Sequence, residues 1–179
     1  DKGTAEALGD LKFTPQCIII YWGVFMKAED VVLLYGKDII SSDGMQSTKK
    51  YIQHGNTSVF EHCINVACMC VYIAKHLHIK VDERNLVRGA LLHDYFLYDW
   101  HVPDDSHKWH GFTHPRTALR NARKRFRLNK VERDMILRHM FPLNITPPRY
   151  KESVILCLAD KLYAIFETFY IKRFNFKVE

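Results

Sequence analysis

Apolar residues recur at helical intervals along most of the chain, and this pattern predicts an all-α fold. The clearest predicted helix begins at "SVFE", where Ser58 and Glu61 have the spacing of a capping box, and it continues to about His78. A second predicted helix begins after Asp82, a favourable N-cap residue, and extends to about Trp100. Both helices would turn one apolar side toward a common core.

Three further helices are predicted downstream. One begins near "HPRTAL", because proline suits the first helical turn, and continues to about Phe126. Asn129 can cap a shorter helix that stops before Pro142. A long helix from Pro148 to about Ile171 carries apolar residues along one face. The chain from residue 45 onward is therefore predicted to consist of successive packed helices.

The first part of the chain has the weakest pattern. We therefore divide the chain into a poorly patterned N-terminal segment, residues 1–44, and a helical domain, residues 45–179. The apolar stretch Cys17–Met26 is too short to span a bilayer and lacks the basic flank and cleavage site of a secretory signal. It fits a core-packing strand or helix, or a leader before Met26. With 179 residues, of which 47% are hydrophobic, the chain can bury one core.

Charge and cysteine content narrow the classes of partner. The formal net charge of +6 favours anionic partners such as phosphorylated small molecules or nucleic acid. The densest basic run, Arg120–Lys130, has helical spacing and no interleaved aromatic platform, so a solvated helix face is favoured over a nucleic-acid interface. The five cysteines form an odd number without a CxxC pair, which argues against a disulfide framework or a thiolate zinc site. We expect a cytoplasmic protein with reduced thiols and no membrane partner.

Histidine and aspartate side chains occupy the apolar faces or the ends of five predicted helices. These residues are His62, His93, Asp94, His114, His139 and Asp160. A single histidine on an apolar face is most often a hydrogen-bonded core residue, but two carboxylates and four imidazoles in one interior need mutual pairing or a cation. Imidazole with carboxylate and no thiolate suits Fe, Mn, Co or Zn. Six ligands exceed the needs of one tetrahedral ion and Asp94 can bridge two, so we expect two divalent transition metal ions.

The order of these residues resembles that of the HD-domain metal-dependent phosphohydrolases, whose signature is a histidine, an adjacent His-Asp pair and a distant aspartate on an all-helical fold. The segments that carry the resemblance are "FEHCINVA", "GALLHDYFL", "THPRTAL", "ILRHM" and "LADKLYA", which together cover roughly residues 50–170. The resemblance implies a helical bundle around a metal site. It also implies two sets of ligands, His62, His93, Asp94 and Asp160 for one ion and His114, His139 and Asp94 for the other.

The expected chemistry is attack of a metal-bridging hydroxide on phosphorus, because two cations lower the pKa of a shared water molecule. Asp94 is the expected catalytic bridge. Lys161, which follows one ligand, and Arg116, two residues past another, are candidates for neutralising the phosphoryl oxygens. Either one could instead be an ordinary surface cation.

Further residues are candidates for contact with substrate: His54, His110, Asp99 and Arg149. His54 fits the mouth of a pocket or a solvated loop. His110 could compete with His114 for the second ion if its helix began earlier. Asp99 fits a general acid, a partner of a metal ligand or a structural residue, and Arg149 fits a phosphate contact or a surface cation.

The chain departs from two subfamilies of this resemblance. After His139, "HMFPLNITPPRY" lacks the Gly-Tyr-Pro stretch of cyclic-dinucleotide phosphodiesterases, and "HDYFLYDW" lacks the Glu-Asp pair of alarmone hydrolases. The resemblance therefore implies a stand-alone hydrolase of a phosphoester or phosphoanhydride in a small phosphorylated metabolite, with a nucleotide as the expected substrate. The alternative is a non-catalytic metal- or ligand-binding module that holds an ion for sensing or stability. Nucleic-acid binding is the least favoured function.

Overall fold

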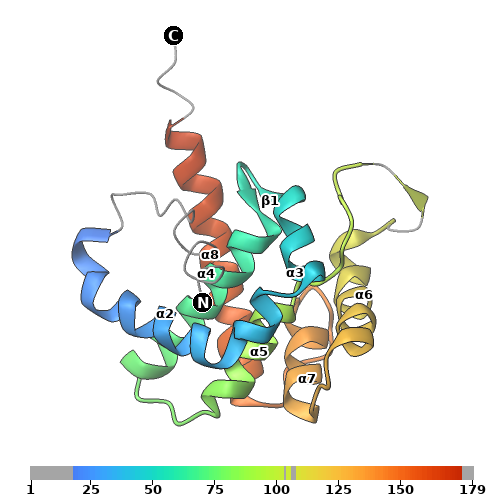
Figure 1. The fold of residues 1–179 in the computed structure, drawn as a ribbon. Coiled ribbons are helices and arrows are strands. Elements are labelled where there is room, and N and C mark those ends of the chain that lie inside the picture. Colours follow the sequence, from blue (N-terminus) through green and yellow to red (C-terminus); the bar gives the residue numbers. More distant parts are fainter. Residues whose placement is uncertain (1–17, 103, 106–107, 175–179) are drawn as a thin grey trace.

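The computed structural model describes residues 18–102, 104–105 and 108–174, whose backbone forms a helical bundle (Figure 1). The long helices are α2 (Ile18–Ile40), α4 (Val59–His76), α5 (Glu83–Leu92), α6 (His110–Arg125), α7 (Lys130–Arg138) and α8 (Lys151–Phe174). The other described elements are α3 (Asp43–Ser47), the 3-10 helix η1 (Thr48–Lys50) and the antiparallel strands β1 (Ile52–His54) and β2 (Thr57–Ser58). The predicted all-α fold class is confirmed, and the described residues add a small hairpin.

Side-chain caps begin three helices where the sequence predicts them. The Ser58 hydroxyl accepts a hydrogen bond from the backbone N–H of Glu61, whose carboxylate accepts one from the backbone N–H of Ser58. Asn129 and Glu132 form the same reciprocal arrangement at the start of α7. Asp82 caps α5. These local interactions place three of the helices that carry or precede the candidate ligands.

The helix predicted to extend to Trp100 is shorter than expected, because α5 ends just before the His-Asp pair. Beyond this point the side-chain amide of Asn121 donates to the carbonyl oxygens of Tyr95 (3.3 Å) and Phe96 (2.9 Å). These two carbonyl oxygens therefore have a hydrogen-bond partner although the helix does not continue. Leu97 then adopts a positive φ of 63°, which turns the chain away from the helix axis.

The start predicted for the third helix, at His114-Pro115, is also wrong, because α6 begins at His110. Trp109 precedes the helix in a left-handed conformation with φ of 63°. The ring of His110 stacks on that of Trp100, with 5.0 Å between ring centroids, and its Nδ1 atom lies 2.9 Å from the Tyr98 hydroxyl. These tertiary contacts hold the added first turn, which the preference of proline for a helix start does not predict.

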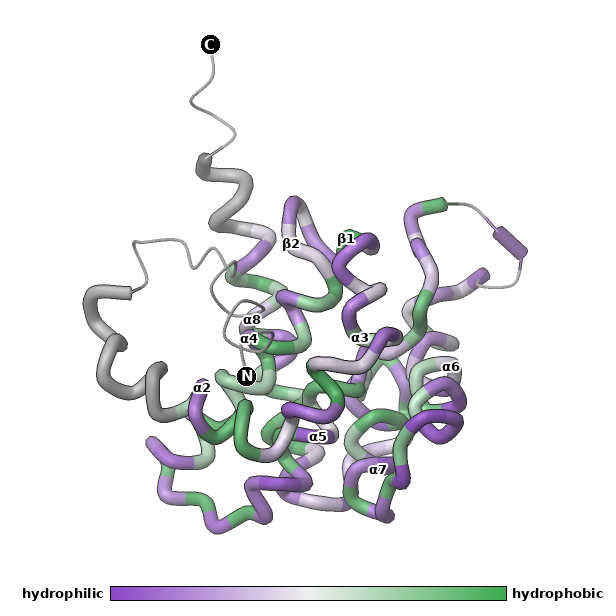
Figure 2. The backbone as a smooth tube through the Cα atoms, in the orientation of Figure 1, coloured by the Kyte–Doolittle hydropathy of each residue, from purple (hydrophilic) through white to green (hydrophobic). Residues whose placement is uncertain are grey.

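Helix α4 lies in the middle of the bundle and packs against α2, α5 and α8 (Figure 1). Hydrophobic stretches of α2, α4 and α5 lie where these helices meet (Figure 2). Helix α2 contributes Ala28, Val32 and Ile39 to the core. A side chain at Gly36 would collide with Leu91, so glycine lets α2 and α5 approach closely. This packing fixes α5, whose end carries the His-Asp pair.

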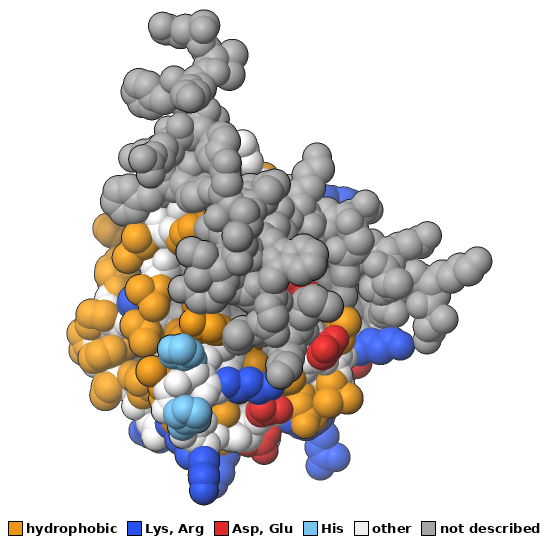
Figure 3. All heavy atoms as spheres, turned by 90° about the vertical axis from the view of Figure 1, so that its left-hand side faces the viewer, with side chains coloured by type: hydrophobic (Ala, Val, Ile, Leu, Met, Phe, Trp, Pro, Cys, Tyr) orange, Lys and Arg blue, Asp and Glu red, His pale blue; other side chains and the backbone are white. Residues whose placement is uncertain are grey.

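The N-terminal stretch that the sequence left open is helical from Ile18 onward, as the first part of α2, while Cys17 lies outside the described residues. The domain boundary expected at residue 44 stays a prediction. None of the described helices combines the length and the apolar character needed to cross a membrane. On the α2 side of the molecule, basic, acidic and hydrophobic side chains lie close together (Figure 3).

Candidate metal centre

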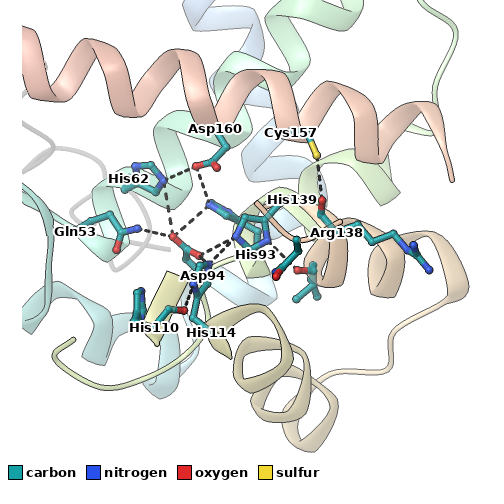
Figure 4. A network of polar contacts seen from close by, with 12 residues as sticks. Gln53, His62, His93, Asp94, His110, His114, Arg138, His139, Cys157 and Asp160 are labelled. Carbon is teal, nitrogen blue, oxygen red and sulfur yellow. Dashed lines mark hydrogen bonds and ion pairs between the residues drawn. The ribbon is translucent and has the colours of Figure 1, made fainter. Parts of the chain in front are cut away.

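Five helices bring the six candidate ligands together in the interior (Figure 4), and Asp160 joins the other five through its contacts with His62 and His93. His62 lies in α4, Asp160 in α8 and His114 in the second turn of α6. His93 is the C-cap of α5, and His139 is the C-cap of α7. The aspartate that follows His93 completes the set. All six residues are at most 9% exposed, so their charges are held away from bulk water.

Four of the ligands, His62, His93, Asp94 and Asp160, form what we call the first cluster. His62 Nε2 lies 3.2 Å from Asp160 Oδ1 and 4.0 Å from Asp94 Oδ2. His93 Nε2 lies 3.5 Å from each of the same two oxygens. Two imidazole nitrogens and two carboxylate oxygens therefore face one small volume.

The second cluster consists of Asp94, His114 and His139. Asp94 Oδ1 lies 3.3 Å from His114 Nε2 and 3.5 Å from His139 Nε2. The two Nε2 atoms are 2.8 Å apart. Because the other oxygen of Asp94 faces the first cluster, this carboxylate joins the two groups of imidazoles.

Each of the four imidazoles is held through Nδ1 and turns Nε2 toward the clusters. The Nδ1 contacts are His62 to Glu167 Oε2 (3.0 Å), His93 to Ala90 O (2.6 Å), His114 to His110 O (2.8 Å) and His139 to Ile136 O (2.9 Å). A carbonyl oxygen only accepts hydrogen bonds, so the Nδ1 atom facing it donates its proton. A neutral ring held in this way keeps a lone pair on Nε2, which is the atom a metal needs.

These atoms fit metal ions better than a network of hydrogen bonds. The Nε2 atoms of His114 and His139 face each other although Nδ1 carries the proton of each neutral ring. Among the described residues, His93 Nε2 and Asp94 Oδ1 are buried without a hydrogen-bond partner. A divalent cation in each cluster would satisfy these atoms, and the mixture of imidazole and carboxylate suits a transition metal. The chain thus holds two groups that can bind divalent metals.

The two carboxylates of the first cluster are held in the ionised form that binds a cation. Burial alone would raise the pKa of Asp94, but the neighbouring imidazoles, His93 first among them, hold it well below its ordinary value. Burial also disfavours ionised Asp160, yet the hydrogen bond with His62 lowers the pKa of this carboxyl. For His62 itself burial lowers the pKa, and the bonds with Asp160 and Glu167 overcome it and raise the pKa to about 10, so a metal ion that binds Nε2 of this ring has to displace a proton. Because the pKa values of Asp94 and Asp160 are both lowered, the two aspartates are anionic at neutral pH.

Two residues of this centre are absent from the sequence predictions. Gln53 on β1 is 8% exposed, and its Nε2 atom donates to Asp94 Oδ2 at 2.6 Å. Glu167 is 4% exposed and holds His62. Glu167 lies seven residues after Asp160, two helical turns along the same face, so helical spacing could have indicated it. No local pattern marks Gln53, because its partner is 41 positions away.

Three other predicted residues lie against the centre. His54 is half-buried, and its ring meets that of His62 edge to face with 5.8 Å between centroids. Burial, together with the charge of His62, lowers the pKa of His54. The ring of His110 stacks on the α6 ligand of the second cluster with 4.5 Å between centroids. Lys161 Nζ donates to the carbonyl oxygen of His139 at 2.9 Å, so this cation supports the main chain at a ligand.

The remaining predicted site residues are not brought to the clusters. Asp99 lies beyond α5, where its carboxylate is 3.3 Å from His101 Nδ1. Arg149 is exposed, and its backbone N–H donates to a carboxylate of α7. Arg116 is exposed on α6, about 200° of helical rotation from His114. Because His114 points into the interior, Arg116 points away from it.

The sequence of this chain matches a known protein family. The family model described as HD domain matches residues 59–165, more than half of the chain. The matched range contains all six candidate ligands, but it begins after Gln53 and ends before Glu167. Searches of the curated proteins and of the solved structures found no match.

Proposed function

The chain belongs to the HD-domain family, and from this membership and the two joined clusters we propose that it is a metal-dependent phosphohydrolase. The proposed reaction is hydrolysis of a phosphoester or phosphoanhydride bond in a small phosphorylated metabolite, specifically a nucleotide. The observation that carries the proposal is the position of Asp94, whose two oxygens face different imidazole groups. A carboxylate in this position can link two cations, the arrangement used in two-metal phosphoryl chemistry.

The proposed ligand sets follow the two clusters. His62, His93, Asp94 and Asp160 would hold one ion, and Asp94, His114 and His139 the other. Fe, Mn, Co and Zn suit these ligands. When bound, such ions polarise a phosphoryl group and bring the pKa of water toward neutrality.

The surrounding residues of the chain orient the ligands. Glu167 and three main-chain carbonyls set the rotation and the tautomer of the four imidazoles. The amide of Gln53 holds Oδ2 of Asp94, which leaves Oδ1 facing the second cluster. Lys161 fixes the main chain at His139. This support limits the rearrangement that the ligands need when a phosphate approaches.

The cations and histidines outside the ligand sets differ in the role that we propose for them. Lys161 acts by supporting His139, since its Nζ atom is already bonded to main-chain carbonyl oxygens. Arg116 is left out of the catalytic set because it lies on the opposite side of α6. His54 and His110 lie against rings of the ligands and are the residues we propose for contact with substrate.

A non-catalytic metal-binding module is the second candidate, and the burial of the clusters favours it. The most exposed ligand, Asp160, is only 9% exposed. Structural sites are closed by protein ligands, whereas a catalytic site keeps positions for water and substrate. The two candidates therefore differ in turnover and not in metal content.

Metal analysis combined with a substrate screen separates these functions. The full chain, purified without oxygen, is analysed for metals and then assayed with Mn²⁺ or Fe²⁺ against nucleoside mono-, di- and triphosphates. We expect about two ions per chain and hydrolysis that Asp94→Ala abolishes, while His76→Ala, at the exposed end of α4, keeps wild-type activity. Bound metal without turnover of any compound would favour the module. Absence of metal after reconstitution would refute both candidates.

A further inference from the structure

A basic groove is lined by residues of α6 and α7. These two helices lie beside each other in the bundle (Figure 1). The groove has a volume of about 340 Å³, and we call it the α6 groove. Its lining residues are Arg116, Leu119, Arg120, Arg123, Lys124 and Leu137. The groove therefore combines four cations with two leucines.

The cations of the α6 groove are not balanced by acidic residues. The sequence contains no Asp or Glu between Asp105 and Glu132, a stretch that includes the whole of α6. The acids of α7 have other partners, since Glu132 lies 3.2 Å from Arg88 and Asp134 lies 2.6 Å from Arg138. In the part of the chain that the structure describes, no carboxylate is paired with a groove cation. On the α2 side, by contrast, both signs of charge are interspersed (Figure 3).

The α6 groove is distinct from the metal clusters. His114, Ala118 and Ala122 form the buried side of α6. Arg120 and Arg123 are exposed, and Arg123 lies about 180° of helical rotation from His114. A ligand in the groove would contact side chains that point away from the clusters. The site consequently does not depend on the proposed function.

We propose that the α6 groove binds a small molecule that carries at least two phosphate groups and an apolar portion, of which a nucleoside diphosphate is an example. Arginine side chains bind phosphate oxygens through paired hydrogen bonds, and four cations suit more than one phosphate. Leu119 and Leu137 offer apolar contact, and the volume lies within the usual range of small-molecule sites. A nucleic acid fits less well, because none of the lining residues is aromatic.

Titration calorimetry of the metal-loaded full chain with α,β-methylene adenosine diphosphate, a nucleoside diphosphate that resists hydrolysis, tests this proposal. We expect saturable binding that weakens as salt is added, because the contacts are between charges. The double variant Arg120→Gln/Arg123→Gln should raise Kd by roughly tenfold or more, and Lys124→Gln should raise it less. Arg127→Gln, an exposed cation of the same basic run outside the groove, should leave Kd unchanged.

One further variant, His62→Ala in the first cluster, identifies where the compound binds. Weakening by the groove substitutions, with wild-type binding in His62→Ala, supports the proposal. Binding that survives the double variant but disappears in His62→Ala would place the compound at the clusters, which overturns the groove site and agrees with the proposed function. Absence of binding to the wild type, or equal weakening by Arg127→Gln, would also overturn the groove site. Wild-type thermal unfolding and metal content of the double variant establish that it is folded.

Discussion

Glu167→Gln separates the charge of the carboxylate behind His62 from its shape. Glutamine keeps the size of the side chain but removes the negative charge that faces His62 Nδ1 at 3.0 Å. Because Glu167 is 4% exposed, water has little access to replace the lost interaction. A less firmly held and less basic imidazole is a weaker metal ligand. We therefore expect the variant to fold and to bind metal less tightly.

The expected loss of metal affinity follows from the burial of Glu167 and from its direct contact with a metal ligand, His62. Loss of such a supporting group lowers metal affinity about 10- to 100-fold, which corresponds to about 1.4–2.7 kcal/mol. At a metal concentration roughly 1,000 times the wild-type Kd, metal binding stabilises the wild type by about 4.1 kcal/mol and would stabilise the variant by about 1.4–2.7 kcal/mol. With about 2–4 °C per kcal/mol for a chain of this size, the rise in Tm caused by metal should be smaller by about 3–11 °C.

Competition with a chromogenic chelator measures the affinity, and thermal scans with and without metal measure the rise in Tm. Comparing the rise within each protein removes any change in the stability of the metal-free form. Glu152→Gln is the matched control, because Glu152 is a buried acid of the same helix that accepts from the Asp82 backbone N–H at 3.1 Å, outside the clusters. Wild-type metal affinity in Glu167→Gln would refute the reasoning. An equal loss in Glu152→Gln would show that any buried charge on α8 has this effect.

Three other predictions concern the second cluster, the packing of α5 and the thiols. His139→Ala should lower metal content by about one ion per chain in elemental analysis, because the first cluster keeps its ligands; unchanged content would contradict the assignment. Gly89→Ala should lower the free energy of unfolding in urea by about 1–3 kcal/mol, since the new methyl group would collide with Met135, whereas Gly111→Ala, which meets only ordinary contact at 3.4 Å, should not destabilise the fold. Equal stability of the two variants would argue against close packing at Gly89. In Cys17→Ser protein the remaining thiols should react with a disulfide reagent only on unfolding, and fast reaction of the native protein would contradict their burial. These thiols are Cys63, Cys68, Cys70 and Cys157, all buried, and burial raises the pKa of Cys68 to about 12.

Most helices and all six candidate ligands could be predicted from the sequence because their signals are local. The caps Ser58, Asp82 and Asn129 act on backbone groups within one turn, so the starts of α4, α5 and α7 need no knowledge of the fold. Ionisable side chains on apolar faces are uncommon, which made His62 and Asp160 recognisable. The resemblance to the HD-domain family rested on these residues, and the family match confirms it.

Predictions from local sequence were wrong where contacts with distant residues, or the geometry of the helix, decide the structure. Proline predicts a helix start at its own position, but the rings around His110 stabilise an earlier turn of α6. Closeness in sequence also led to the prediction that Arg116 lies near the ligands, because it is two residues from His114. Side chains two positions apart on a helix lie on nearly opposite faces. Arg116 therefore points away from His114 although the two residues are close in sequence.

The pairing of individual atoms in the centre depends on how the helices cross. Periodicity states which face of a helix is buried, but it does not state which carboxylate meets which imidazole. Glu167 meets His62 across 105 positions and Gln53 meets Asp94 across 41, through the packing of α8 and β1 against the rest of the bundle. The two oxygens of Asp94 are likewise shared between clusters only because α5, α6 and α7 end or pass at one point. Such contacts arise from the relative positions of whole helices, which no short stretch of the sequence contains.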